Sequence, residues 1–181
     1  MTSRQNPAAA IRIMAGAAFF AGAVALAHAN GLWINTTDSL PRGLWIETPS
    51  HGIVRGDFAL ICLPDTPAVK VGQARGYIAS GSCPTGQEVV LKPVAAVPGD
   101  IVTVSPMGVA VNDQPIDNSA ALVHDGDGKG LAGYPPGAYA VPPDRIWLVS
   151  SHNPRSFDSR YFGPVPTAGV LKTARPLWVF N

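Results

Sequence analysis

Apolar residues follow two distinct patterns along this chain. An uncharged apolar run occupies residues 13–27, and beyond it short apolar runs alternate with turn-forming residues. Short runs bounded by Gly, Pro and Asp are typical of strands joined by tight turns. They predict strands at 43–46, 58–63, 88–97, 101–104, 109–111, 138–141, 145–149 and 177–180. The pattern therefore predicts a mostly β fold of coiled antiparallel sheets.

The domain organisation follows from where this strand pattern begins and how little interrupts it. No linker divides residues 31–181, so we expect one β domain there, preceded by a separate N-terminal segment over residues 1–30. Residues 117–136 are polar and Gly-rich and are predicted to form a surface loop or a flap.

The N-terminal run predicts a membrane anchor. Residues 8–29 supply the roughly 20 apolar positions of a spanning helix if Arg12 extends its charge to the interface. Arg4 and Arg12 precede the run and no basic residue follows until Arg42, which predicts a cytoplasmic N-terminus and an exported domain. The alternative is a cleaved signal peptide, because residues 27–29 (Ala-His-Ala) fit the small-x-small cleavage pattern.

Composition narrows the class of protein. Apolar residues make up 46% and charged residues 14% of the chain, which excludes disorder, and the net charge of +1 gives no footprint for nucleic acid. The only two cysteines are Cys62 and Cys83. In an oxidising compartment an even count predicts one disulfide, with two unpaired thiols as the alternative.

Lys92 interrupts the apolar run at 88–97. In a strand of period two, Val90, Lys92 and Val94 share one face. Such a lysine is either a charge on an edge strand, which the neighbouring Pro93 favours, or a desolvated amine with a function.

Two polar segments offer partners for that amine. Ser39 follows Asp38 and precedes Leu-Pro, a setting more typical of a turn or helix cap than of a nucleophile. Residues 151–165 are dense in hydroxyl, carboxylate and guanidinium groups. This segment is either a solvated loop with a weak surface pair of Asp158 and Arg160, or a polar network presented to a site.

In chain order, these segments resemble the sequence boxes of type I signal peptidases, most closely the TraF-type conjugative-transfer signal peptidases that mature pilin precursors. The matching boxes are SLPRGL (39–44), GDFA (56–59), KPVAAVPGD (92–100) and SFDSRYFG (156–163). Four boxes in order behind an anchor form a specific signal. The chain departs from the pattern at Leu40, where Met is usual, and at residues 151–155, which replace Gly-Asp-Asn.

The resemblance implies a catalytic dyad. Ser39 would attack the scissile carbonyl, and a neutral Lys92 would take its proton. The Ser39 backbone N–H and the Thr37 hydroxyl would form the oxyanion hole.

The resemblance also implies supporting residues behind the dyad. Ser156 would hydrogen-bond the lysine amine and aim it, while Asp158 and Arg160 would fix the loop that carries Ser156. No metal or organic cofactor is implied.

The expected function is that of an anchored endopeptidase that cleaves exported precursor proteins after small residues. Its expected partners are a precursor substrate, with a conjugative pilin favoured, and the lipid bilayer; nucleic acid is not expected. The resemblance places the chain in the bacterial inner membrane as a single-pass protein with its catalytic domain in the periplasm, and implies that product cyclisation is open to it. The alternatives are a general leader peptidase, a self-cleaving repressor-type protein, and an inactive scaffold subunit of a conjugation or secretion apparatus.

Overall fold

The computed structural model describes residues 7–49 and 51–180. The chain divides into two compact units, Met1–Trp33 and Ile34–Asn181. Arg4 and the start of the predicted cytoplasmic segment lie outside the described residues.

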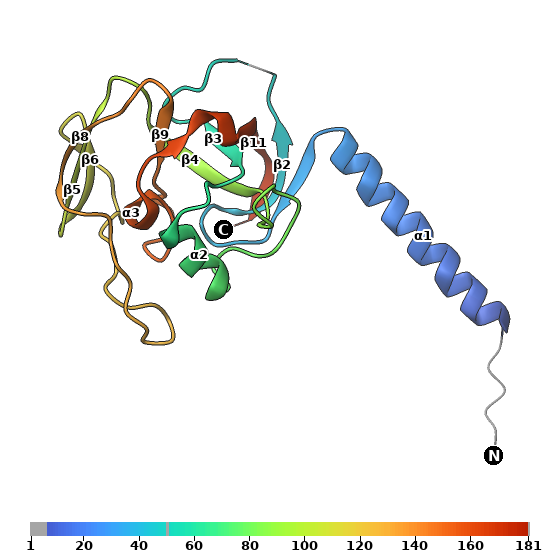
Figure 1. The fold of residues 1–181 in the computed structure, drawn as a ribbon. Coiled ribbons are helices and arrows are strands. Elements are labelled where there is room, and N and C mark those ends of the chain that lie inside the picture. The colour runs from blue at the N-terminus through green and yellow to red at the C-terminus, as the bar shows by residue number, and fades with distance from the viewer. Residues whose placement is uncertain (1–6, 50, 181) are drawn as a thin grey trace. The chain divides into compact units, whose positions relative to one another are not determined.

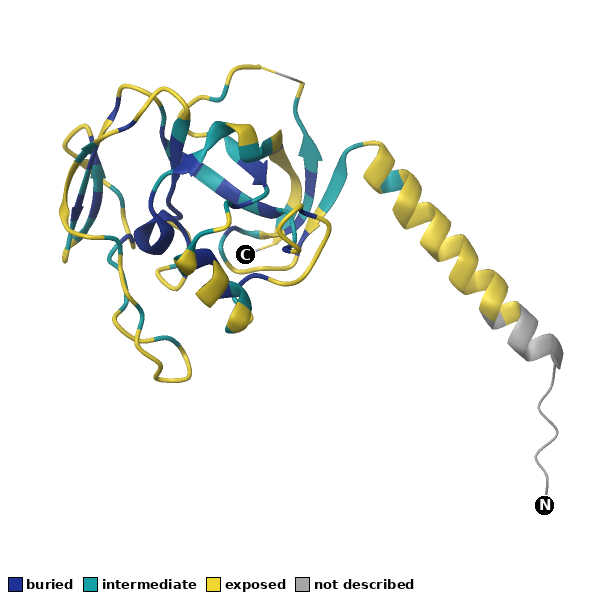
Figure 2. Cartoon of the chain, viewed as in Figure 1, coloured by how far each residue is buried: buried dark blue, intermediate teal, exposed yellow. Residues whose placement is uncertain are grey.

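The first unit is dominated by one helix, α1 (Pro7–Ala29). The helix ends where Gly31, at a φ of 77°, donates its N–H to the His28 carbonyl at 2.9 Å, a left-handed stop that glycine adopts without strain. Apolar side chains along α1, among them Phe19 and Phe20, are exposed (Figure 2). Within the described part of the chain, no helix has the length and apolarity needed to cross a membrane. The transmembrane anchor therefore stays a prediction.

Antiparallel strands form two sheets (Figure 1). The seven-stranded sheet has the order β1-β2-β11-β3-β4-β9-β10, and the four-stranded sheet has the order β7-β6-β5-β8. The strands are β1 (Leu32–Asn35), β2 (Arg42–Glu47), β3 (Phe58–Ile61), β4 (Val90–Ala96), β5 (Ile101–Ser105), β6 (Gly108–Val111), β7 (Gln114–Pro115), β8 (Gly137–Ala140), β9 (Arg145–Leu148), β10 (Val165–Pro166) and β11 (Val170–Phe180).

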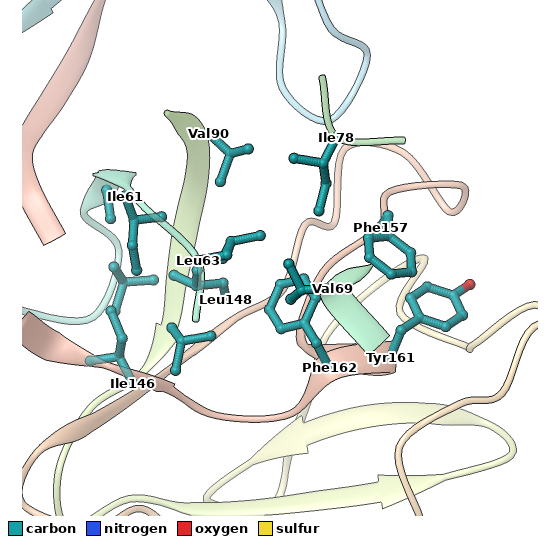
Figure 3. Close-up of a cluster of buried hydrophobic side chains, with 13 residues drawn as sticks. Ile61, Leu63, Val69, Ile78, Val90, Ile146, Leu148, Phe157, Tyr161 and Phe162 are labelled. Atoms are coloured by element: carbon teal, nitrogen blue, oxygen red, sulfur yellow. The ribbon is translucent and has the colours of Figure 1, made fainter. Parts of the chain in front are cut away.

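Two hydrophobic cores are joined by β9. Ile146 and Leu148 belong to the core that lies between the larger sheet and the helices α2 (Pro67–Ala74) and α3 (Ser159–Phe162), where Val69 and Phe162 also pack (Figure 3). Trp147 and Val149 belong to the core of the smaller sheet. Because successive side chains of a strand point to opposite faces, one short strand serves both cores.

The prediction of a mostly β fold with antiparallel sheets is confirmed, and each predicted strand coincides with an observed one. The sequence pattern missed the helices α2 and α3 and the short strands β1, β7 and β10. It also missed the first half of β11, which begins at Val170.

The alternative of an edge position for Lys92, which Pro93 favours in the sequence, is wrong, because β4 lies inside the sheet between β3 and β9. The physical reason is how Pro93 is accommodated. The Val94 N–H donates to the Asp57 carbonyl and the Val94 carbonyl accepts the Gly56 N–H, both on the β3 side of the strand. Because the backbone groups of successive residues in a strand point to alternate sides, the nitrogen of Pro93 faces β9. Val94 pairs with Leu148, the last residue of β9, so Pro93 lies just beyond the paired stretch and no ladder hydrogen bond is lost there.

Cys62, which directly follows β3, forms a disulfide with Cys83, with the two Cα atoms 5.6 Å apart. The Cys83 N–H also donates to the Gln87 carbonyl at 2.9 Å. The Gln87 amide in turn donates to the Leu63 carbonyl at 2.7 Å. The disulfide and these hydrogen bonds hold the 79–88 loop beside the end of β3.

Replacing both cysteines (Cys62→Ala with Cys83→Ala) should lower the free energy of unfolding by about 2–4 kcal/mol, because the cross-link restricts the unfolded chain. Urea unfolding followed by tryptophan fluorescence measures this loss. Wild-type protein treated with a reducing agent should unfold at the midpoint of the double variant. A double variant that unfolds with the oxidised wild type would contradict the expectation.

Candidate active site

Ser39 lies on a tight loop between β1 and β2 that is organised by the buried side chain of Asn35. The Asn35 amide nitrogen donates to the carbonyls of Thr37 (3.1 Å), Leu40 (3.0 Å) and Pro41 (3.1 Å). Its amide oxygen accepts the Thr37 N–H at 3.2 Å and the Thr37 hydroxyl at 2.8 Å. The Asn35 side chain thus makes hydrogen bonds to both donor and acceptor groups of the loop. These bonds fix the turn on which Ser39 lies.

Lys92 projects into the interior from β4, where burial alternates along the strand and includes Val90, Lys92 and Val94 on one face, as predicted. Its Nζ atom lies 2.6 Å from Ser39 Oγ and 3.2 Å from Ser156 Oγ. The lysine is 7% exposed. Three residues that lie far apart in the sequence therefore meet at one amine.

Burial lowers the pKa of the Lys92 amine from 10.5 to about 8, with smaller contributions from Asp158 and Glu88, which raise it, and Arg160, which lowers it. A substantial fraction of the amine is therefore neutral near pH 8. A neutral amine carries a lone pair that can accept the proton of the Ser39 hydroxyl.

Asp158 and Arg160 form an ion pair whose two side chains are fully buried. Arg160 Nε lies 2.8 Å from Asp158 Oδ1 and Nη2 lies 2.7 Å from Oδ2, a two-pronged geometry. The alternative of a solvated surface pair is therefore wrong. Arg160 also donates to backbone carbonyls around it, those of Asn118 (2.8 Å), Ser150 (3.4 Å), Asn153 (3.4 Å), Pro154 (3.1 Å) and Ser156 (3.1 Å).

Sequence reasoning missed Ser150, which follows β9 and is completely buried. Its hydroxyl donates to the Ser39 carbonyl at 2.5 Å, and its N–H donates to Asp158 Oδ2 at 3.0 Å. Local pattern gives no signal for Ser150, because its contact is 111 positions away in the chain. Asn35 was missed although an Asn before a turn is a recognisable signal.

Ser39, Lys92 and Ser156 line a cleft of about 300 Å³. The predicted loop at 117–136 supplies part of its lining with Leu122 and Leu131. The other lining residues are Asp38, Tyr77, Asp125, Gly126, Asn153, Arg155, Phe157 and Tyr161. In the described residues, no group of three or more His, Cys, Asp or Glu side chains is placed to hold a metal ion.

The tip of this loop is clasped by Asp125. The Tyr77 hydroxyl and Arg75 Nη1 (3.3 Å) both reach Asp125 Oδ2, while Oδ1 accepts the N–H groups of Asp127 (2.9 Å) and Lys129 (2.8 Å). The hydrogen bond from Tyr77, together with these backbone donors, lowers the pKa of Asp125 to about 2. The clasp fixes the loop against the segment that follows α2.

Asp125→Asn should loosen this loop at neutral pH. The asparagine side chain has one acceptor oxygen, and its NH₂ group would face N–H or O–H donors that now bind the carboxylate. Hydrogen exchange resolved over 122–131 should show lower protection, while the exposed neighbour Asp127→Asn serves as the control. A carboxyl with a lowered pKa stabilises the folded state above the ordinary pKa of about 4 and loses that effect as pH falls through about 2. Wild type should therefore lose protection in this window, and Asp125→Asn should show no such transition. Equal protection in both variants would refute the clasp.

The described site brings two serine hydroxyls to one buried lysine amine, and comparison with known families identifies the class of protein. The sequence model of one protein family, the signal peptidases (peptidase S26), matches residues 4–179 of this chain. The chain belongs to this family of serine-type peptidases, which confirms the resemblance of its sequence boxes.

Particular relatives extend over nearly the whole chain. The conjugal transfer protein TraF of Agrobacterium tumefaciens (strain 15955) is 38% identical over 174 residues, covering 95% of this chain and 97% of that protein. A plasmid transfer protein TraF of Escherichia coli is 33% identical over 165 residues, covering 91% and 88%. The solved signal peptidase I of Enterococcus faecalis V583 aligns with a TM-score of 0.36 at 19% identity, over 68% of this chain and 97% of that chain.

Proposed function

We propose that this protein is an endopeptidase in which Ser39 is the nucleophile and Lys92 the general base. The observation that carries the proposal is the 2.6 Å separation of Lys92 Nζ and Ser39 Oγ around a buried amine whose pKa is lowered to about 8. Membership of a serine-type peptidase family supports the same assignment.

The reaction proceeds by acyl transfer. Ser39 Oγ attacks the scissile carbonyl carbon while its proton passes to the neutral Lys92 amine. Lys92 then gives this proton to the leaving amine as the C–N bond breaks, which leaves an acyl ester on Ser39. A water molecule, deprotonated by Lys92, hydrolyses the ester and restores the enzyme. Ser156, 3.2 Å from the amine, aims Lys92 throughout.

The developing oxyanion is stabilised by the Ser39 N–H and by Thr37. The Thr37 hydroxyl donates to Asn35 Oδ1 at 2.8 Å, and in the proposed reaction it turns to the oxyanion instead. While the Thr37 hydroxyl changes partner, Asn35 Oδ1 continues to accept the hydrogen bond from the Thr37 N–H.

The substrate we propose is an exported precursor of a conjugation apparatus, with a pilin favoured. The support is the set of relatives named as conjugal or plasmid transfer proteins that match most of this chain. If the amino terminus of the same substrate replaces water, its nitrogen would attack the acyl ester, forming an amide bond that closes the product into a ring. The ester C–O bond breaks, and the amine's proton passes through Lys92 to Ser39 Oγ. The exposed apolar side chains of α1 and the disulfide in the second unit support attachment to the inner membrane with residues 31–181 in the periplasm.

Ser39→Ala and Lys92→Met should each reduce precursor cleavage by about 10³-fold or more, since each removes a reacting group. Cleavage of a purified precursor, followed by mass spectrometry, measures this loss. Ser82→Ala and Lys172→Met, at exposed positions, are the matched controls. Lys92→Met should be no less stable than wild type below pH 8, because a buried charge is removed. A Ser39 or Lys92 variant that cleaves at the wild-type rate would refute the dyad.

The pH dependence of kcat/KM should rise with an apparent pKa of about 8, because the free enzyme must hold Lys92 neutral. At pH 7 the rate should be about a tenth of its plateau. Rates with a peptide substrate between pH 6 and 10 measure this profile. A profile that is flat across this range would assign the base to another group.

A further inference from the structure

The Ser150 hydroxyl connects the nucleophile loop to the buried ion pair. It donates to the Ser39 carbonyl at 2.5 Å and accepts the His152 N–H at 3.2 Å. The backbone of the same residue donates to Asp158 Oδ2 at 3.0 Å. Ser150 is therefore held by one member of the pair while it holds the residue proposed as nucleophile.

We propose that Ser150 is a positioning residue for the peptidase reaction, which fixes the backbone of Ser39 through its carbonyl. This inference rests on the proposed function of Ser39 and Lys92. The Ser39 Cα lies between two tethered carbonyls, that of Thr37, held by Asn35 at 3.1 Å, and its own, held by Ser150. Fixing both limits rotation about the Ser39 backbone and so sets where Oγ and the N–H point.

The same ion pair positions the other half of the dyad. Arg160 donates to the Ser156 carbonyl at 3.1 Å, and the Ser156 hydroxyl lies 3.2 Å from Lys92 Nζ. Ser39 reaches the pair through Ser150, and Lys92 reaches it through Ser156. The buried pair of Asp158 and Arg160 therefore fixes the positions of both the nucleophile and the base relative to one another.

Ser159 offers a matched comparison within the same segment. It is as completely buried as Ser150, and its hydroxyl accepts the Leu148 N–H at 2.9 Å. Removing either hydroxyl takes a partner from a backbone group, the partly buried Ser39 carbonyl or the buried Leu148 N–H, so both changes should lower stability. Ser150, unlike its counterpart, directly contacts the nucleophile.

Acylation of Ser39 by p-nitrophenyl acetate, read as the pre-steady-state burst of p-nitrophenol, tests the proposal without the natural substrate. Ser150→Ala should slow acylation by about 10–100-fold, since displacing a reacting group by about 1 Å can cost 10²-fold. Ser159→Ala should stay within about threefold of wild type after both are corrected for folded fraction. Equal slowing in the two variants would overturn the proposal.

An isosteric pair of variants separates the hydroxyl from packing. Ser150→Thr and Ser150→Val have the same shape and differ in the hydroxyl, so the Thr variant should acylate at least tenfold faster than the Val variant. The apparent pKa of acylation should stay near the wild-type value in both variants, because burial and the charges of Asp158, Arg160 and Glu88 set the pKa of Lys92 and neither variant replaces them. Equal rates for the folded Thr and Val variants would exclude a positioning role.

The controls distinguish this inference from the proposed function. A wild-type burst that persists in Ser39→Ala would refute the dyad itself. A burst that requires Ser39 and Lys92 but is unaffected in Ser150→Ala would refute the role of Ser150 and leave the dyad in place.

Discussion

The proposed active site depends on the buried ion pair of Asp158 and Arg160. Taking two charges out of water costs several kcal/mol per ion, and this cost is offset where geometry is good and the remaining donors find acceptors. The two-pronged contact and the five backbone carbonyls around Arg160 meet both conditions. Those carbonyls belong to the loop that carries Ser156 and, at Asn118, to the loop that lines the cleft, so the pair organises both walls.

The pair also explains how a buried carboxylate can lie near Lys92 while the pKa of the amine stays lowered. An isolated Asp158 would raise the pKa of the lysine amine, and Arg160 lowers it, so the two effects oppose one another. Burial is then the largest cause, and the pKa falls to about 8. A single carboxylate in the same place would raise the pKa of Lys92, and it could not donate hydrogen bonds to the backbone carbonyls that Arg160 holds.

The sequence predicted most of the longer strands and the shared face of Val90, Lys92 and Val94, because period-two alternation is a local property of the chain. Its inference about Pro93 failed, because whether a missing N–H matters depends on where the neighbouring strand ends, which no local pattern contains. The meeting of distant segments came from resemblance to a family rather than from spacing. Ser150 escaped detection because its hydroxyl bonds a backbone carbonyl of a distant segment, and carbonyls are present at every position of the sequence.

Two carboxylates that line the cleft are each paired with an arginine. Asp38 precedes the proposed nucleophile directly, yet it is paired with Arg42 at 2.6 Å. Asp125, on the loop that lines the cleft, is paired with Arg75 at 3.3 Å and accepts the Tyr77 hydroxyl. An unpaired carboxylate at either position would favour the protonated ammonium and so move the working range of the base to higher pH. Pairing each carboxylate with an arginine places a cation beside each of these anions, and burial is the largest cause of the lowered pKa of Lys92.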